Sequence, residues 1–202
     1  MWECAVCHHV ELGIEAPSKC PVCDAPQEKF IPYESKLIKG TKTLQNLKAG
    51  FIGEAQAHQR NLAFAMKAEE EELPQIAKLF RAIAEAEAVH AFNHLRFLGV
   101  VKDTQSNLET AFERETMAEV KMYPQFIKEA EEEGNPGVAL TFSRARDVER
   151  EHARLYKRAL DHLIAERETT YYICSVCGYV SDGILPDECP ICGASKDKFR
   201  KI

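Results

Sequence analysis

The stretch EAEAVHAF, residues 85–92, places Glu87 three residues before His90. Residues three apart are neighbours on one face of a helix, about 5 to 6 Å apart, so both side chains can bind the same metal ion. The stretch belongs to an apolar helical pattern that includes Ile83 before it and Phe97 after it. Two metal-ligating side chains therefore interrupt a stripe that would otherwise form part of a helical core.

A second Glu-x-x-His pair, Glu149 and His152, repeats this pattern in another helical stripe. Each pair is preceded by an inward glutamate on an earlier helix, because Glu54 stands 33 residues before Glu87 and Glu115 stands 34 residues before Glu149. Isolated buried carboxylates are costly, so four of them must be neutralised by protons, by opposite charges or by metal. A chain with 32 acidic residues also produces Glu-x-x-His by chance. Two matched hairpins nevertheless favour a dinuclear metal site.

Proline and glycine divide the middle of the chain into helices. Pro74 cannot continue a helical hydrogen-bond ladder, and Gly99 and Gly134 are suitable C-terminal stops. Pro136 suits a first helical position, and Ser106 opens a Ser-x-x-Glu capping box. These signals predict helices at about 43–72, 74–98, 106–134 and 136–167.

The short breaks between these helices imply two antiparallel pairs. The segment VVKDTQSN, residues 100–107, can span roughly 30 Å when extended, so it can cross the length of a bundle. We therefore expect a mainly α protein, with a four-helix bundle over residues 40–167. Two small metal-binding modules, residues 1–35 and 170–202, flank it.

All eight cysteines fall in C-x-x-C pairs in these two terminal segments, which align with each other. Each copy is too short and too poor in apolar residues to fold without a cross-link. Four thiolates that bind one metal ion would provide this cross-link. In a reducing cytosol such pairs are metal sites more often than disulfides. Tetrahedral sulfur suits iron or zinc, so a structural zinc ribbon is the competing interpretation. The predicted ligands are Cys4, Cys7, Cys20 and Cys23 in one module and Cys174, Cys177, Cys189 and Cys192 in the other.

The composition argues against several other functions. The chain has 202 residues, 29% of them charged and 45% hydrophobic, as in ordinary globular proteins. Its net charge of -6, with acids and bases interspersed, leaves no basic patch for nucleic acid. No run of about 18 apolar residues and no signal-peptide pattern occurs. We expect a cytoplasmic protein without nucleic-acid or membrane partners.

Several segments resemble rubrerythrin, a family of ferritin-like di-iron proteins with rubredoxin-type iron sites. Common members carry the rubredoxin module at the C-terminus alone, whereas this chain has one at each end. The resemblance implies a non-haem di-iron centre bridged by Glu87 and Glu149, and two mononuclear Fe(Cys)4 sites. The resembling segments are KGTKTLQNLKAGFIGEAQA (39–57), EAEAVHAF (85–92), MYPQF (122–126) and YICSVCGYV with CPICG (172–180 and 189–193). The implied di-iron ligands are Glu54, Glu87, His90, Glu115, Glu149 and His152.

The chain departs from the family pattern around its third helix. The family has a seventh ligand, a glutamate three residues after the position of Glu115, and here that position is Ala118. Glu119, one residue later, is either a substitute metal ligand or a solvated helix glutamate. A family tyrosine is replaced by Asn61, while Tyr123 is kept. Tyr123 is a candidate catalytic residue that donates a hydrogen bond near the metals, or else a core tyrosine.

The other histidines are interpreted as non-ligands. His58 and His94 fall on inward helix positions but are not needed by a six-ligand site, so we expect them to be hydrogen-bonded beside it. His8 and His9 are expected on the surface, because four cysteines already complete the neighbouring metal site.

The N-terminal copy differs from the C-terminal copy at two glycine positions. His8 stands where the C-terminal copy has Gly178, and Asp24 stands where it has Gly193. Glycine accepts positive φ most readily, and histidine and aspartate are among the better substitutes. We expect the N-terminal module to keep its fold, with altered hydrogen bonding to sulfur.

The resemblance implies a peroxidase that reduces hydrogen peroxide to water in oxidative-stress defence, with electrons relayed through the Fe(Cys)4 sites. No nucleotide-binding glycine motif occurs, so an NAD(P)H-linked reductase would be a separate protein. Alternatives are oxygen reduction or ferrous oxidation at the same di-iron site, and a non-enzymatic electron carrier or zinc scaffold. The family also implies a homodimer, with exchanged helices in some members.

Overall fold

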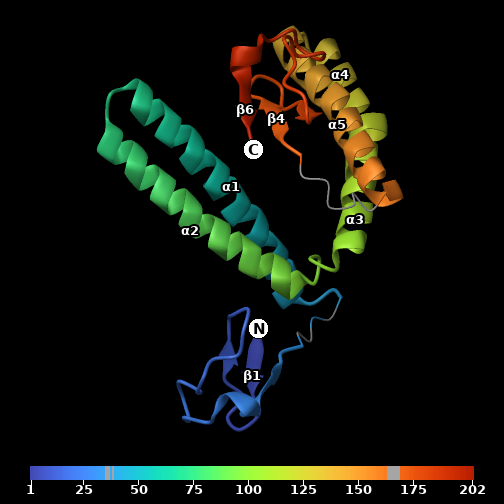
Figure 1. The fold of residues 1–202 in the computed structure, drawn as a ribbon. Helices are drawn as coiled ribbons and strands as arrows, with labels where there is room; N and C mark the ends of the chain where they lie inside the picture. The colour runs from blue at the N-terminus through green and yellow to red at the C-terminus, as the bar shows by residue number, and fades with distance from the viewer. Residues whose placement is uncertain (35–36, 38, 163–168) are drawn as a thin grey trace. The chain divides into compact units, whose positions relative to one another are not determined.

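The structure is a computed structural model that describes residues 1–34, 37, 39–162 and 169–202. The chain divides into two compact units, Met1–Val100 and Val101–Ile202. Each unit combines one terminal cysteine module with one set of antiparallel helices (Figure 1). The boundary between the units falls at the start of the predicted crossover.

The helices of the first unit form an antiparallel hairpin of α1 (Lys42–Glu70) and α2 (Pro74–Leu98) (Figure 1). The Thr41 side chain caps α1 by accepting a hydrogen bond from the Leu44 N–H at 3.3 Å. Gly99 ends α2 with a left-handed φ of 64°. The break at Pro74 and the stop at Gly99 confirm the predicted helix boundaries.

The buried residues of this hairpin are all alanines, which allow its two helices to pack closely. Large apolar side chains of the same helices stay exposed. An exposed apolar face of this kind marks a contact surface, so the hairpin has the character of half a helical core. The buried alanines are Ala65, Ala68, Ala77, Ala84 and Ala91, and the exposed apolar residues include Ile52, Phe64, Leu79, Ile83 and Phe92.

The first helix of the second unit begins earlier than the sequence predicts. Asp103, not Ser106, caps this helix: its carboxylate accepts the Ser106 N–H at 3.0 Å and the Ser106 hydroxyl at 2.7 Å. The Ser106 capping box was wrong because the Asp103 carboxylate accepts both the N–H and the hydroxyl of Ser106, so the helix begins earlier, with this charge at the positive end of its dipole. The elements are α3 (Thr104–Met117), the π-helix Ala118–Met122, α4 (Tyr123–Glu132) and α5 (Pro136–His162).

The π-helix Ala118–Met122 interrupts what the sequence predicted as one continuous helix. A π turn takes up an extra residue and so changes which residues face the core after it. Such turns often occur at functional sites, and this one follows Glu115 by three residues. The next helix starts at Pro136 as predicted, while its predicted end near Arg167 lies outside the described residues.

The terminal modules have the same topology, as their internal repeat predicts. Each has a three-stranded antiparallel sheet, ordered β2-β1-β3 in the first and β5-β4-β6 in the second. Cys4, Cys20 and Phe30 form the buried centre of the first module, so its core is largely its own metal-ligating sulfur. The strands are β1 (Trp2–Cys4), β2 (Val10–Glu11), β3 (Phe30–Pro32), β4 (Tyr171–Cys174), β5 (Val180–Asp182) and β6 (Phe199–Lys201).

The two substituted glycine positions keep the same backbone in both copies. His8 and Asp24 have φ of 60° and 56°, where Gly178 and Gly193 have 84° and 71°. The expectation that the N-terminal copy retains its fold is therefore confirmed at these positions.

The predicted fold class is confirmed: the protein is mainly helical, with a small rubredoxin-like module at each end. The predicted domain limits stay a prediction, and two of them, residues 35 and 167, lie outside the described residues. Within the described ranges, no helix has both the length and the apolarity needed to cross a bilayer.

Candidate metal centres

The four cysteines of the N-terminal module converge on one point. The Sγ atoms of Cys4 and Cys23 lie 3.7 Å apart, and those of Cys7 and Cys20 lie 3.6 Å apart. A disulfide would hold two sulfurs about 2.05 Å apart, so these are separate sulfurs arranged around a common centre. A hydrogen bond from the Cys7 backbone N–H lowers the pKa of the Cys4 thiol to about 7, despite its burial, which favours a thiolate.

The C-terminal module repeats this arrangement. Its Cys174 and Cys192 sulfurs are 3.7 Å apart, and its Cys177 and Cys189 sulfurs are 3.6 Å apart. In both modules the four ligand atoms lie within 4.8 Å of one another. Four convergent thiols fit a single tetrahedral ion such as iron or zinc.

The helical hairpin of the first unit gathers Glu54, Glu87 and His90, whose ligand atoms lie within 4.8 Å of one another. His90 Nδ1 lies 3.0 Å from Glu87 Oε2 and 4.0 Å from Glu54 Oε1. The Glu-x-x-His spacing on α2 thus places both side chains on the face that meets α1.

Two further histidines pack beside this triad. The ring of His58 donates through Nδ1 to the backbone carbonyl of Ala84 at 2.8 Å, which confirms its prediction as a hydrogen-bonded neighbour. His94 lies over Gly50 of α1, where even an added Cβ would come within 3.1 Å of its Nε2. These rings fill the space between α1 and α2 next to the ligands.

The second unit gathers the matching triad of Glu115, Glu149 and His152, again within 4.8 Å. His152 Nδ1 lies 2.9 Å from Glu149 Oε2. Burial raises the pKa of Glu115, and repulsion from the nearby Glu149 carboxylate raises it further. Two carboxylates so close need a proton or a cation between them, so this donor set fits a divalent metal.

The opposite edge of the His152 ring contacts the C-terminal module. His152 Nε2 donates to the backbone carbonyl of Gly178 at 3.2 Å, and Gly178 directly follows Cys177. A histidine that donates through one ring nitrogen offers the other as the metal ligand. The contact therefore leaves Nδ1 as the ring nitrogen available to a metal, and it joins the ring to the cysteine module. Sequence reasoning missed it, because no local pattern links residues that are 26 positions apart.

Ala118, at the family's seventh-ligand position, lines an open hollow of about 580 Å³ that Glu115 and Glu149 also line. Glu119, the proposed substitute, pairs instead with Arg150 of α5, whose Nε lies 2.6 Å from Glu119 Oε1. On the π-helix, Ala118 therefore lines the hollow beside the triad, whereas its neighbour Glu119 forms an ion pair with α5.

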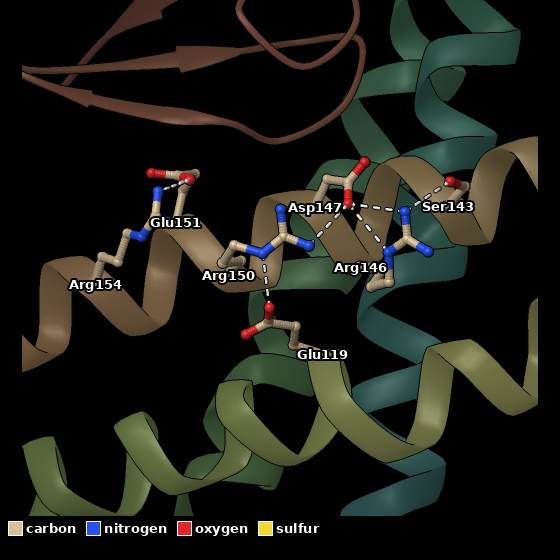
Figure 2. Close-up of polar contacts among 7 residues, drawn as sticks. All are labelled: Glu119, Ser143, Arg146, Asp147, Arg150, Glu151 and Arg154. Carbon is tan, nitrogen blue, oxygen red and sulfur yellow. Dashed lines mark hydrogen bonds and ion pairs between the residues drawn. The ribbon is translucent and has the colours of Figure 1, made fainter.

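Figure 2 shows that the Glu119–Arg150 pair belongs to a polar network along α5. Arg150 also reaches Asp147 at 3.4 Å, and Asp147 accepts a hydrogen bond from Arg146 Nε at 3.0 Å. The Arg146 guanidinium also donates a hydrogen bond to the Ser143 hydroxyl at 3.2 Å. The network holds the π-helix against α5 beside the triad. Sequence reasoning did not find it, because arginines on a helix face are ordinarily solvated.

Tyr123 packs against Phe126 and Phe142, with ring centroids 6.1 Å away in each case. Burial raises the pKa of its hydroxyl, and the charges of Glu149 and Glu115 add to the rise. The phenol is therefore a neutral hydrogen-bond donor close to the second triad. Asn61, which replaces the other family tyrosine, makes a different contact: its side-chain amide donates a hydrogen bond to the Ala57 carbonyl of its own helix at 2.9 Å.

The histidines of the N-terminal module are not among its clustered metal-ligating groups. His8 Nδ1 lies 2.7 Å from Glu3 Oε1, and His9 Nε2 lies 3.2 Å from Glu11 Oε2. The His8 side chain is 78% exposed, as expected of a surface residue.

The choice between Ala118 and Glu119 is testable by iron affinity. Ala118→Glu is expected to place a carboxylate in the hollow beside Glu115 and Glu149 and to tighten iron binding about tenfold. Glu119→Gln is expected to leave the iron content unchanged, and to cost at most about 1 kcal/mol of stability through the loss of its pair with Arg150. Chelator competition measures the first effect and denaturant unfolding the second. Loss of iron from Glu119→Gln, with no gain in Ala118→Glu, would make Glu119 the ligand.

Two Glu-Glu-His triads on long helices, together with two four-cysteine clusters, define a class of protein: ferritin-like di-iron proteins joined to rubredoxin-like modules. The family model for rubrerythrin matches residues 45–160, more than half of the chain. The model for the rubredoxin-like domain of rubrerythrin matches residues 2–31 and 172–200. The chain belongs to the rubrerythrin family.

Individual relatives agree with this assignment. Nigerythrin from Nitratidesulfovibrio vulgaris is 34% identical over 187 residues, covering 82% of this chain and 89% of the relative. Rubrerythrin from Porphyromonas gingivalis is 36% identical over 187 residues, covering 83% and 94%. The structure of partially reduced nigerythrin matches with a TM-score of 0.50 and 34% identity, covering 85% of this chain and 92% of that one. The predicted family and its cofactors, a di-iron site and two rubredoxin-like Cys4 sites, are confirmed.

Proposed function

We propose that this protein is a peroxidase that reduces hydrogen peroxide to water at a di-iron centre. The rubrerythrin family is of the oxidoreductase type and uses peroxide or oxygen with electron donors. The observation that carries the proposal is the pair of matched triads, each with two carboxylates and one imidazole. The proposed ligands are Glu54, Glu87, His90, Glu115, Glu149 and His152, with Glu87 and Glu149 as bridges.

Bound iron would supply the two electrons that hydrogen peroxide takes up, with two protons, to become two water molecules. The four glutamates would balance the positive charge of the metals and the increase in that charge on oxidation, because a carboxylate near a cation favours its ionised form. Burial and the charges of Glu149 and Glu115 raise the pKa of Tyr123, so its hydroxyl would be available to donate a hydrogen bond near the centre.

The proposed electron route runs through the C-terminal module. Cys177 would ligate the metal of this module, the carbonyl of the next residue, Gly178, accepts the His152 N–H, and His152 Nδ1 would be the nitrogen offered to iron. This chain of bonded atoms and one hydrogen bond runs from the cysteine cluster to the Glu115, Glu149 and His152 triad, and it supports the proposed route. The electrons would come from a separate NAD(P)H-linked reductase.

The proposed assembly is a homodimer. The α1–α2 hairpin leaves large apolar side chains exposed, such as Phe64 and Leu79, and the helices of the second unit do the same with Val120 and Leu140. Burial of such faces in the proposed dimer would complete a four-helix bundle around the six proposed ligands, with or without helices exchanged between the two chains.

A second candidate function is oxygen reduction or ferrous oxidation at the same centre. The observation that favours it is Ala118, since the hollow beside Glu115 and Glu149 lacks the family's seventh carboxylate. A third candidate, a zinc scaffold or simple electron carrier, rests on the ability of both Cys4 clusters to hold zinc.

Stopped-flow oxidation of the reduced, iron-loaded protein separates these candidates. Peroxide is expected to oxidise the di-iron centre at least tenfold faster than equimolar oxygen, because a preformed O–O single bond needs just two electrons to break. The same trace reports the thiolate irons, whose visible bands are absent from zinc sites. Equal or faster oxidation by oxygen would contradict the peroxidase proposal, and a colourless protein without helical iron would favour the scaffold.

A further inference from the structure

We propose that the N-terminal module is an acidic docking surface for an external, positively charged one-electron donor protein, while the C-terminal module serves the di-iron centre. This division of roles rests on the proposed function. It follows from three differences between modules that share one fold.

The first difference is the set of contacts that attach the C-terminal module to α5. The Gly178 carbonyl accepts from His152, and Asp182 pairs with Arg158. An added Cβ on Gly178 would lie 3.9 Å from a methyl group of Val148, so the turn approaches the helix closely. A bare glycine and an acidic strand residue thus form this attachment.

The N-terminal copy has lost both features. Sheet register places His8 at the position of Gly178 and Leu12 at that of Asp182. A histidine ring would occupy the space through which the Gly178 carbonyl reaches α5, and leucine cannot pair with an arginine. The N-terminal module therefore cannot use the C-terminal mode of attachment to a helix.

The second difference is exposure at the second metal-ligating turn. Val6 and its counterpart Val176 are similarly exposed, at 58% and 52%, whereas Val22 in the second C-x-x-C turn is 65% exposed. In the C-terminal module the counterpart of Val22, Ile191, is partly buried. Small apolar residues at the edge of a metal site give a partner a dry contact close to the sulfurs, which shortens the path for an electron.

The third difference is charge. Residues 1–34 contain six acidic and two basic side chains, a net charge of -4, whereas residues 170–202 contain four of each and are neutral. A surface of one sign steers partners of the opposite sign and raises their association rate. A second copy of this chain is a poor occupant, because its overall charge is -6. A basic redox protein is the complementary partner, and it would pass one electron to the ferric thiolate site, which becomes ferrous.

Binding to a basic probe protein tests this without any di-iron chemistry. Cytochrome c is titrated into protein that carries zinc in both Cys4 sites, and NMR shift changes are mapped at low salt. We expect the changes to fall in residues 1–34, and the affinity to fall more than tenfold between about 20 mM and 500 mM salt. Shifts centred on residues 170–202, or binding that is insensitive to salt, would overturn the proposal.

Charge-removal variants provide the matched comparison. Glu15→Gln with Glu28→Gln removes two exposed charges from the N-terminal module, and Asp187→Asn with Asp197→Asn removes two from the C-terminal module. The first pair is expected to weaken binding about fivefold and the second by less than 1.5-fold. In the iron-loaded protein, the Glu15→Gln and Glu28→Gln double variant should also slow the one-electron reduction of ferricytochrome c by the reduced thiolate sites, again about fivefold. Equal effects of the two pairs would contradict the division of roles. Failure of the peroxide experiment would leave this binding result intact, so the two proposals fail separately.

Discussion

Replacing Glu149 with alanine is expected to empty the di-iron site and to lower the rate of oxidation by peroxide at least 100-fold. Glu149 contacts His152 at 2.9 Å and, through its charge, raises the pKa of Glu115, so it lies at the centre of the second triad. Loss of residues that merely orient metal ligands already costs about 10- to 100-fold, and a bridging ligand should cost more. Iron per chain and stopped-flow oxidation measure the two effects.

The control for this variant is Glu151→Ala, two residues further along α5. Glu151 pairs with Arg154 at 2.5 Å and lies outside the clustered ligands (Figure 2). The Glu151→Ala variant loses one negative charge from α5, as Glu149→Ala does, but it should keep its full iron content. Equal iron loss in both variants would attribute the effect to α5 as a whole, and normal iron in Glu149→Ala would reject Glu149 as a ligand.

Gly178→His should slow reduction of the di-iron centre by the C-terminal module about 10- to 100-fold, the cost typical of disturbing a residue that orients a metal ligand. The module should still fold, because its N-terminal copy carries His8 at this position with φ of 60°. The new ring would meet Val148 and separate the carbonyl from His152. Single-turnover reduction, followed at the visible bands of the thiolate iron, measures the transfer.

Gly193→Asp is the matched control for the histidine variant. It also places a side chain at a left-handed position, it also copies a residue of the N-terminal module, Asp24, and nothing lies within 4 Å of its Cβ. We expect unchanged electron transfer from this variant. If both variants slow the transfer alike, backbone strain in the module explains the loss, and the route through His152 is wrong.

Much of the fold could be predicted because its signals are local. Pro74, Gly99 and Pro136 fix helix ends through φ and hydrogen-bond limits that act within a few residues. The Ser106 cap failed for an equally local reason, since Asp103 accepts the N–H and the hydroxyl of Ser106 itself. The π-helix at Ala118 gives no comparable signal, because one extra residue in a turn leaves the apolar pattern almost unchanged.

Both kinds of metal-binding set could be recognised from the sequence. C-x-x-C and Glu-x-x-His spacings bring side chains together within a single turn or along a single helix face, so they survive in the fold as clusters within 4.8 Å. The contacts of Glu119 with Arg150 and of His152 with Gly178 became known only from the folded protein, because these partners are 31 and 26 residues apart. Such contacts depend on how helices rotate and pack against their neighbours, and no short-range periodicity encodes that rotation.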